Sequence, residues 1–187
     1  MVELGALWLP ILLSAVFVFI VSSVIHMASP WHKHDYPKLA NEDQVLNGLR
    51  ALNLPPGDYF VPKAESMDEM RTPEFKKKID QGPMVLMTVM PKGMMNMSKA
   101  MTGWFIYVLV VGIFGAYITS RAVPAGTDYL HVFRFVGAST FLAYAGALWP
   151  QSIWYHRSWG ITIKMTIDGL IYALVTAGTF GWLWPKM

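Results

Sequence analysis

The stretch SWGITIKMTIDGLIYALVTAGTFGWLWP, residues 158–185, decides the fold of this chain. Its apolar part, 161–184, has about the length that crosses the hydrocarbon core of a bilayer with some tilt. Small residues recur at every fourth position, which places them along one side of a helix. Small residues let two helices in lipid approach closely. We therefore predict a transmembrane helix that packs on its neighbours through Gly169, Ala173, Ala177 and Gly181.

A polar stripe runs beside this strip and contains Lys164, Asp168 and Tyr172. A carboxylate inside a span costs about 2.5 kcal/mol or more unless it is paired, hydrated or protonated. Two explanations stay open for Asp168. It serves as a proton relay or a ligand counter-ion, or it forms a buried pair with Lys164 that only fixes helix packing.

The composition is typical of a multi-span membrane protein. The 187 residues are 54% hydrophobic and 14% charged, a balance unlike that of soluble domains. The absence of cysteine excludes disulfides, iron–sulfur clusters and thiolate catalysis. The net charge of +3 fits loop topology better than nucleic-acid binding. Only Glu3 is charged ahead of the first apolar stretch, so we expect a retained span and not a signal peptide.

We predict an all-α membrane protein, a four-transmembrane-helix bundle with a small α+β loop domain between spans one and two. Residues 1–28 form the first transmembrane helix, and residues 29–99 form the hydrophilic domain. Residues 100–187 contain the other spans, at about 100–122, 129–149 and 161–184. Further small residues for helix packing are Gly112 and Ala116 on the second span, and Ser139, Ala143 and Ala147 on the third.

The hydrophilic domain shows helix and strand signals. We expect a helix over 41–52 with Asn41 as its cap, and a second helix that starts at Thr72 and ends near Gly82. The segments 58–61 and 83–90 are candidate strands that pair with each other. The core of so small a domain is minimal, so we expect it to need the membrane domain or a partner.

Charge near the span ends predicts the orientation. The loop-domain side carries Lys33, Lys38, Lys92, Lys99, Arg157 and Lys164, whereas the opposite side carries Arg121, Arg134 and Lys186. Cytoplasmic loops are enriched in lysine and arginine. We therefore expect a cytoplasmic large loop with both termini outside.

Antiparallel threading of the spans brings His26, at the end of the first span, to the depth of Lys164 and Asp168. Such a cluster at a membrane boundary could shuttle protons, or bind a quinone or a lipid headgroup, with Tyr172 one helical turn further in. Polar residues near span ends are also common without a function.

A second constellation has the character of a metal site. It combines His32 and His34 with Met94, Met95 and Met97. Imidazole and thioether together suit copper, especially Cu(I), but solvated histidines and apolar methionine packing explain the same pattern. Haem between two histidines of this chain is disfavoured, because His26 and His131 lie on opposite sides of the membrane. We predict no cofactor outright and leave copper, or a haem shared with a partner, as alternatives.

Two stretches carry a resemblance. SSVIHMASPWHKHDY (22–36), and TDYLHVFRFVG (127–137) with IDGLIYALVTAGTFGWLWP (167–185), resemble a group of small uncharacterised bacterial inner-membrane proteins. The resemblance covers most of the chain. It implies a bacterial source and an inner-membrane location, and it assigns no functional residues.

No nucleotide-binding loop, serine nucleophile elbow or HExxH motif is present in the sequence, so we do not expect an enzyme. The leading hypothesis is a non-catalytic accessory subunit of a larger respiratory or photosynthetic inner-membrane complex. Its partners would be the lipid bilayer and other membrane subunits, or further copies of the chain. The alternatives are a small oligomeric transporter or proton-coupled channel that uses Asp168, and a membrane metal- or cofactor-binding protein.

Overall fold

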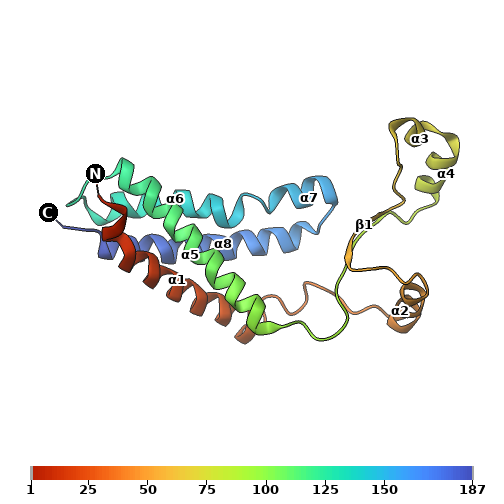
Figure 1. Ribbon diagram of the computed structural model, residues 1–187, viewed down its shortest axis with the longest axis horizontal. Helices are drawn as coiled ribbons and strands as arrows, with labels where there is room; N and C mark the ends of the chain where they lie inside the picture. The colour runs from red at the N-terminus through yellow and green to blue at the C-terminus, as the bar shows by residue number, and fades with distance from the viewer. Residues whose placement is uncertain (1, 187) are drawn as a thin grey trace. The chain divides into compact units, whose positions relative to one another are not determined.

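A computed structural model describes residues 2–186, and these residues form two compact units. The bundle unit runs up to Pro37 and resumes at Asn96, and the loop unit is Lys38–Met95. Figure 1 shows the helices of the bundle unit side by side. The residues 29–37, which the sequence suggested as the start of the loop domain, belong to the bundle unit.

The bundle unit contains four helices that are long and apolar enough to cross a membrane, judged by length and composition over the described residues. The prediction of four candidate spans is therefore confirmed. A 3-10 turn, η1 (Leu4–Leu7), leads into α1 (Trp8–Ser23), which ends in a π-helical turn, η2 (Val24–Ala28). The other elements are α5 (Met97–Ala122), α6 (Tyr129–Ala145), α7 (Trp149–Tyr155) and α8 (Trp159–Leu183).

The four long helices pack as a closed ring: α1 packs on α5 and α8, and α6 packs on the same two helices. One apolar core joins the chain ends to the α5–α6 turn and includes Leu7, Val132 and Phe180. There the Trp184 indole donates to the Pro124 carbonyl at 2.9 Å, which ties the end of α8 to that turn. The described termini accordingly lie at one end of the bundle unit (Figure 1). A second core lies further along the bundle and includes Val18, Val108 and Tyr144.

The small residues of α8 lie where this helix meets α6. A side-chain carbon added at Gly169 would lie 3.2 Å from the Cβ of Ala145 and 3.3 Å from that of Tyr144. The corresponding position on α5 is Gly115, where an added carbon would lie 2.8 Å from Thr140. These glycines therefore permit the close approach of α6 to both neighbours.

The face that α6 buries is not the strip of small residues that the sequence analysis predicted. Ala143 and Ala147 are exposed and Ser139 is half-exposed. The buried face of α6 instead consists of Val132, Val136, Thr140 and Tyr144. Both sets recur every four residues, and small size alone does not distinguish them. The buried set carries the larger apolar side chains, which fill the core between α5 and α8.

The loop unit contains α2 (Glu42–Ala51), β1 (Gly57–Val61), α3 (Met67–Arg71), α4 (Pro73–Gln81) and β2 (Val85–Val89). The strands pair antiparallel, with Gly57 opposite Val89 and Val61 opposite Val85, as the sequence predicts. The Thr72 hydroxyl caps α4 by accepting from the Phe75 amide. Among the residues that the structure describes in this unit, only Phe75 has a fully buried side chain.

Two short helices of the structure are absent from the prediction. The sequence analysis predicts no helix between the spans at 129–149 and 161–184, but α7 lies there. It also passes over α3, although Ser66 and Glu69 have capping-box spacing. The Ser66 hydroxyl accepts from the Glu69 amide, and the Glu69 carboxylate accepts from the Glu65 amide. The Ser66–Glu69 pattern was thus a usable signal for α3.

Candidate functional site

The segment that follows the first span folds back onto α8. We call residues 29–36 the return segment. The π-helical turn η2 precedes it, and the Ser29 hydroxyl closes that turn by donating to the Ile25 carbonyl at 2.6 Å. Two tight turns follow, in which the Lys33 amide donates to Pro30 and the Asp35 amide donates to His32. These turns place Trp31, His32 and Asp35 against the first half of α8.

Asp168 lies at the centre of this contact. Its side chain is only 4% exposed. The Trp31 indole donates to Asp168 Oδ1 at 3.1 Å, and His32 Nε2 lies 2.8 Å from Oδ2. Both carboxylate oxygens are therefore hydrogen-bonded by the return segment, which offsets the cost of burying the carboxylate.

His32 lies between two carboxylates. Its Nδ1 is 2.6 Å from Asp35 Oδ2, and its Nε2 faces Asp168. A neutral imidazole carries one N–H, so the tautomer of His32 decides to which of the two carboxylates a neutral ring donates.

Lys164 continues this chain of polar groups. Its ammonium donates to Asp35 Oδ1 at 2.6 Å and to the Trp31 carbonyl at 2.9 Å. The hydrogen bond from Lys164, followed by that from His32, holds the pKa of Asp35 below its ordinary value. The predicted pair of Lys164 with Asp168 does not form. Lys164 pairs with Asp35 instead, and His32 links Asp35 to Asp168.

His26 approaches the cluster from the π-helical turn. Its Nε2 lies 3.2 Å from the Tyr172 hydroxyl. Its ring stacks on that of His32, with centroids 4.5 Å apart and planes 15° from parallel. The structure thus brings together Asp168, Lys164, His26 and Tyr172, the four residues that the sequence analysis grouped as a possible proton or ligand site.

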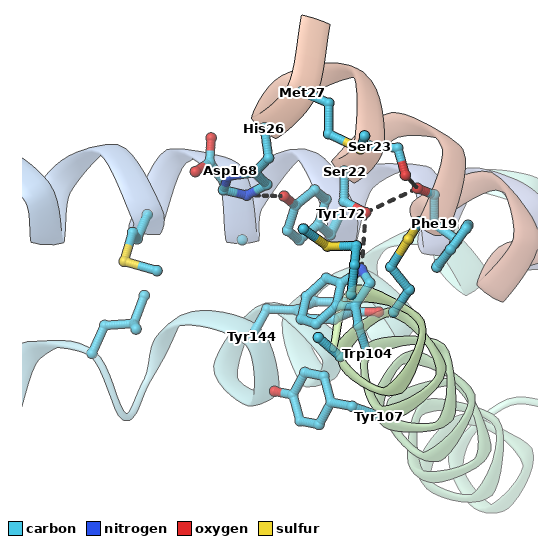
Figure 2. A pocket seen from close by; sticks show the side chains of 16 residues that line it. Phe19, Ser22, Ser23, His26, Met27, Trp104, Tyr107, Tyr144, Asp168 and Tyr172 are labelled. Carbon is cyan, nitrogen blue, oxygen red and sulfur yellow. Dashed lines mark hydrogen bonds between the residues drawn. The ribbon is translucent and has the colours of Figure 1, made fainter. Parts of the chain in front are cut away.

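A cavity of about 450 Å³ adjoins this cluster and is partly open to the outside. In Figure 2, His26, Asp168 and Tyr172 form one wall of it. The remainder is mostly apolar, and thioethers are prominent in it. The lining methionines are Met27, Met97, Met101 and Met165.

Four aromatic rings from three helices form another wall of the cavity. Trp104, Tyr107, Tyr144 and Tyr172 make a closed cycle in which successive ring centroids are 5.5 to 6.1 Å apart. The Trp104 indole donates to the Ser22 hydroxyl at 2.9 Å, and the Tyr107 hydroxyl donates to the Ala143 carbonyl. Both hydrogen bonds fix the orientation of this wall, and Figure 2 shows the bond from Trp104 to Ser22.

The Tyr144 hydroxyl is the exception in this wall. It is buried, and it makes no well-formed hydrogen bond within the described chain. The nearby Thr176 hydroxyl donates to the Tyr172 carbonyl and keeps lone pairs that can accept, but no well-formed bond joins it to Tyr144. A buried hydroxyl without a well-formed bond costs about 1–3 kcal/mol, so its presence beside a cavity calls for an explanation.

The residues predicted as a copper set belong to both units of the chain. His32 belongs to the cluster and Met97 lines the cavity, whereas the His34 side chain is exposed. Met94 and Met95 belong to the loop unit, where they are 100% and 69% exposed. Among the described residues, His26, His32 and Asp168 form a group that could hold a metal ion, because their ligand atoms all lie within 4.8 Å of one another.

Sequence reasoning missed the contacts of Trp31 and Asp35 with α8, and the place of Tyr144 in the cavity wall. A local signal existed for the return segment, since Ser29-Pro30 ends the helix and His32-x-x-Asp35 has the spacing of a turn. No periodic pattern linked that segment to α8, which lies more than a hundred residues further along the chain.

The chain matches no protein-family model, no curated protein and no solved structure.

Proposed function

We propose that this protein is an integral membrane protein that binds a small membrane-soluble molecule, with a flat, hydrogen-bonding ring and an apolar tail, in the cavity beside Asp168. This is the chemistry of a quinone. One observation carries the proposal: an aromatic-walled cavity meets a wall of hydrogen-bonding side chains at one end of a bundle of four apolar helices.

The size and lining of the cavity support such an occupant. Pockets for small ligands commonly have volumes of about 300–1,000 Å³, with apolar and aromatic walls and a few placed polar groups. Here Trp104 and Tyr107 offer ring faces, and the lining methionines offer adaptable apolar surface. His26, and the Tyr144 hydroxyl that lacks a well-formed bond, offer hydrogen bonds for ring oxygens.

The test is to fill the cavity by mutation. Ala100 lines the cavity, and replacing it with Phe would occupy the space of a ligand ring. Gly103 lies on the same helix, and nothing lies within 4 Å of a carbon added there. Gly103→Phe is therefore the matched control. The probe is a ubiquinone analogue with a short saturated tail, added to the full chain in lipid nanodiscs.

We expect Ala100→Phe to weaken probe binding by about tenfold or more, because overfilling a packed space costs about 1–3 kcal/mol. Gly103→Phe should bind as the wild type does. Equal binding by both variants, or no saturable binding by the wild type, would show that the cavity takes no quinone-like ring. Mass spectrometry of the protein extracted from native membranes identifies the bound molecule. A phospholipid in place of a quinone would assign the cavity to a lipid headgroup.

We further propose that the protein works as an accessory subunit in a larger bacterial inner-membrane assembly. The exposed small residues Ala143, on the outer face of α6, and Ala147, in the turn that follows this helix, support the proposal because they leave room for a helix of another chain. Stoichiometric recovery of other membrane subunits after mild-detergent extraction is the expected result. Recovery of the chain alone as a monomer would remove this part of the proposal.

A further inference from the structure

The cluster at the head of the cavity has the composition of a metal centre. We propose that His26, His32 and Asp168 bind a divalent first-row transition metal. Two imidazoles and one carboxylate form a donor set that is common for Zn²⁺ and Fe²⁺, and the chain supplies no thiolate to favour another metal.

The three ligand atoms already lie near one another. His32 Nε2 and Asp168 Oδ2 are 2.8 Å apart, and the ligand atom of His26 lies within 4.8 Å of both. A bound ion needs each ligand atom at about 2.0–2.2 Å, so adjacent ligands lie roughly 3–3.5 Å apart around it. Rotation of the His26 side chain, which is exposed, would bring the third ligand to that spacing.

The residues around the ligands are those that a metal centre requires. A ligating histidine usually donates its other N–H to a carboxylate, which fixes the ring and its tautomer. Asp35 Oδ2 lies 2.6 Å from His32 Nδ1 and is held in turn by Lys164. The Trp31 indole occupies Asp168 Oδ1, so that Oδ2 is left to face the ion.

The gap between His32 and Asp168 supplies the position for the ion. In the metal-free cluster, His32 Nε2 and Asp168 Oδ2 face each other at 2.8 Å. A divalent ion would enter between these two atoms as they separate to the spacing of adjacent ligands. His26 and Asp168 also line the cavity, which gives the ion a route of entry and leaves a coordination position for an exogenous oxygen.

Zn²⁺ binding to the full chain in detergent tests this inference directly. The protein is purified with a tag that contains no histidine, stripped with a chelator and titrated by equilibrium dialysis with elemental analysis. We expect one high-affinity Zn²⁺ per chain. Asp35→Asn should weaken Zn²⁺ binding by about 10–100-fold, because Asp35 only orients the ligand His32. His26→Gln and His32→Gln should each weaken Zn²⁺ binding by more than that, because each removes a ligand.

His34 provides the matched control, because it is an exposed histidine of the same segment. His34→Gln should bind Zn²⁺ as the wild type does, whereas an equal loss in this variant would overturn the assignment. Failure of the wild type to bind Zn²⁺ more tightly than a variant lacking both His26 and His32 would overturn it as well.

A spectroscopic readout separates lost ligands from lost folding. With Cu²⁺ as the probe, electron paramagnetic resonance should show two coupled imidazole nitrogens in the wild type and one in His26→Gln. An unchanged nitrogen count in that variant excludes His26 as a ligand. The Zn²⁺ and Cu²⁺ experiments use no cavity ligand, so their outcome is independent of the quinone-binding test.

Discussion

At Asp168, one buried carboxylate accepts hydrogen bonds from side chains that lie more than a hundred residues earlier in the chain. Trp31 and His32 occupy its two oxygens, and the bond of His32 to Asp35 extends the network to Lys164. The carboxylate therefore fixes the return segment on α8. The same contacts shape the polar wall of the cavity, so that stability and any ligand binding depend on the same residues.

We expect Asp168→Leu to lower the free energy of unfolding by about 1–3 kcal/mol for each donor that it leaves buried without a partner. Asp168→Asn should cost less, because its amide oxygen can still accept from Trp31. Thr176→Val on the same helix is the control, since the Thr176 hydroxyl donates to the Tyr172 carbonyl in the preceding turn of α8 and not to Asp168. Thermal unfolding in detergent measures all three variants. A larger loss for Thr176→Val than for Asp168→Leu would contradict the role of Asp168.

The long helices could be predicted from sequence because a span leaves an apolar run of defined length. The same holds for β1 and β2, which turn residues separate from their surroundings. The return segment could not be placed, because its contacts depend on where α8 lies and not on any local period. Likewise, Ala143 and Thr140 both fit a four-residue repeat on α6, but only Thr140 is buried.

The α6–α8 contact depends on Gly169. A carbon added there meets the Cβ atoms of Ala145 and Tyr144, and neither can rotate away. We expect Gly169→Leu to lower the free energy of unfolding by about 1–3 kcal/mol, because the two helices must separate to make room. Gly160→Leu on the same helix should be tolerated, since an added carbon there meets only the Ser158 hydroxyl at 3.6 Å. Thermal unfolding in detergent compares the two, and equal losses would argue against close packing at Gly169.

For the whole molecule, the orientation in the membrane is open to a direct test because the chain contains no cysteine. Single cysteines can therefore be introduced without background labelling. The excess of lysine and arginine near the span ends on the loop-unit side predicts that this side faces the cytoplasm. Asp68, in α3, is a suitable exposed site on the loop unit, and Thr127, between α5 and α6, is a half-exposed site on the opposite side.

With a membrane-impermeant maleimide on intact spheroplasts, we expect Thr127→Cys to be labelled and Asp68→Cys to be protected. Inverted vesicles should give the reverse, because each position then faces the other compartment. Labelling of Asp68→Cys from outside would reverse the orientation. The cluster of His26, His32 and Asp168 lies at the end of the bundle unit opposite to the α5–α6 turn, so this result also decides which compartment would supply a metal to it. A cytoplasmic cluster would draw on the intracellular pool of divalent ions, and an external one on the periplasmic pool.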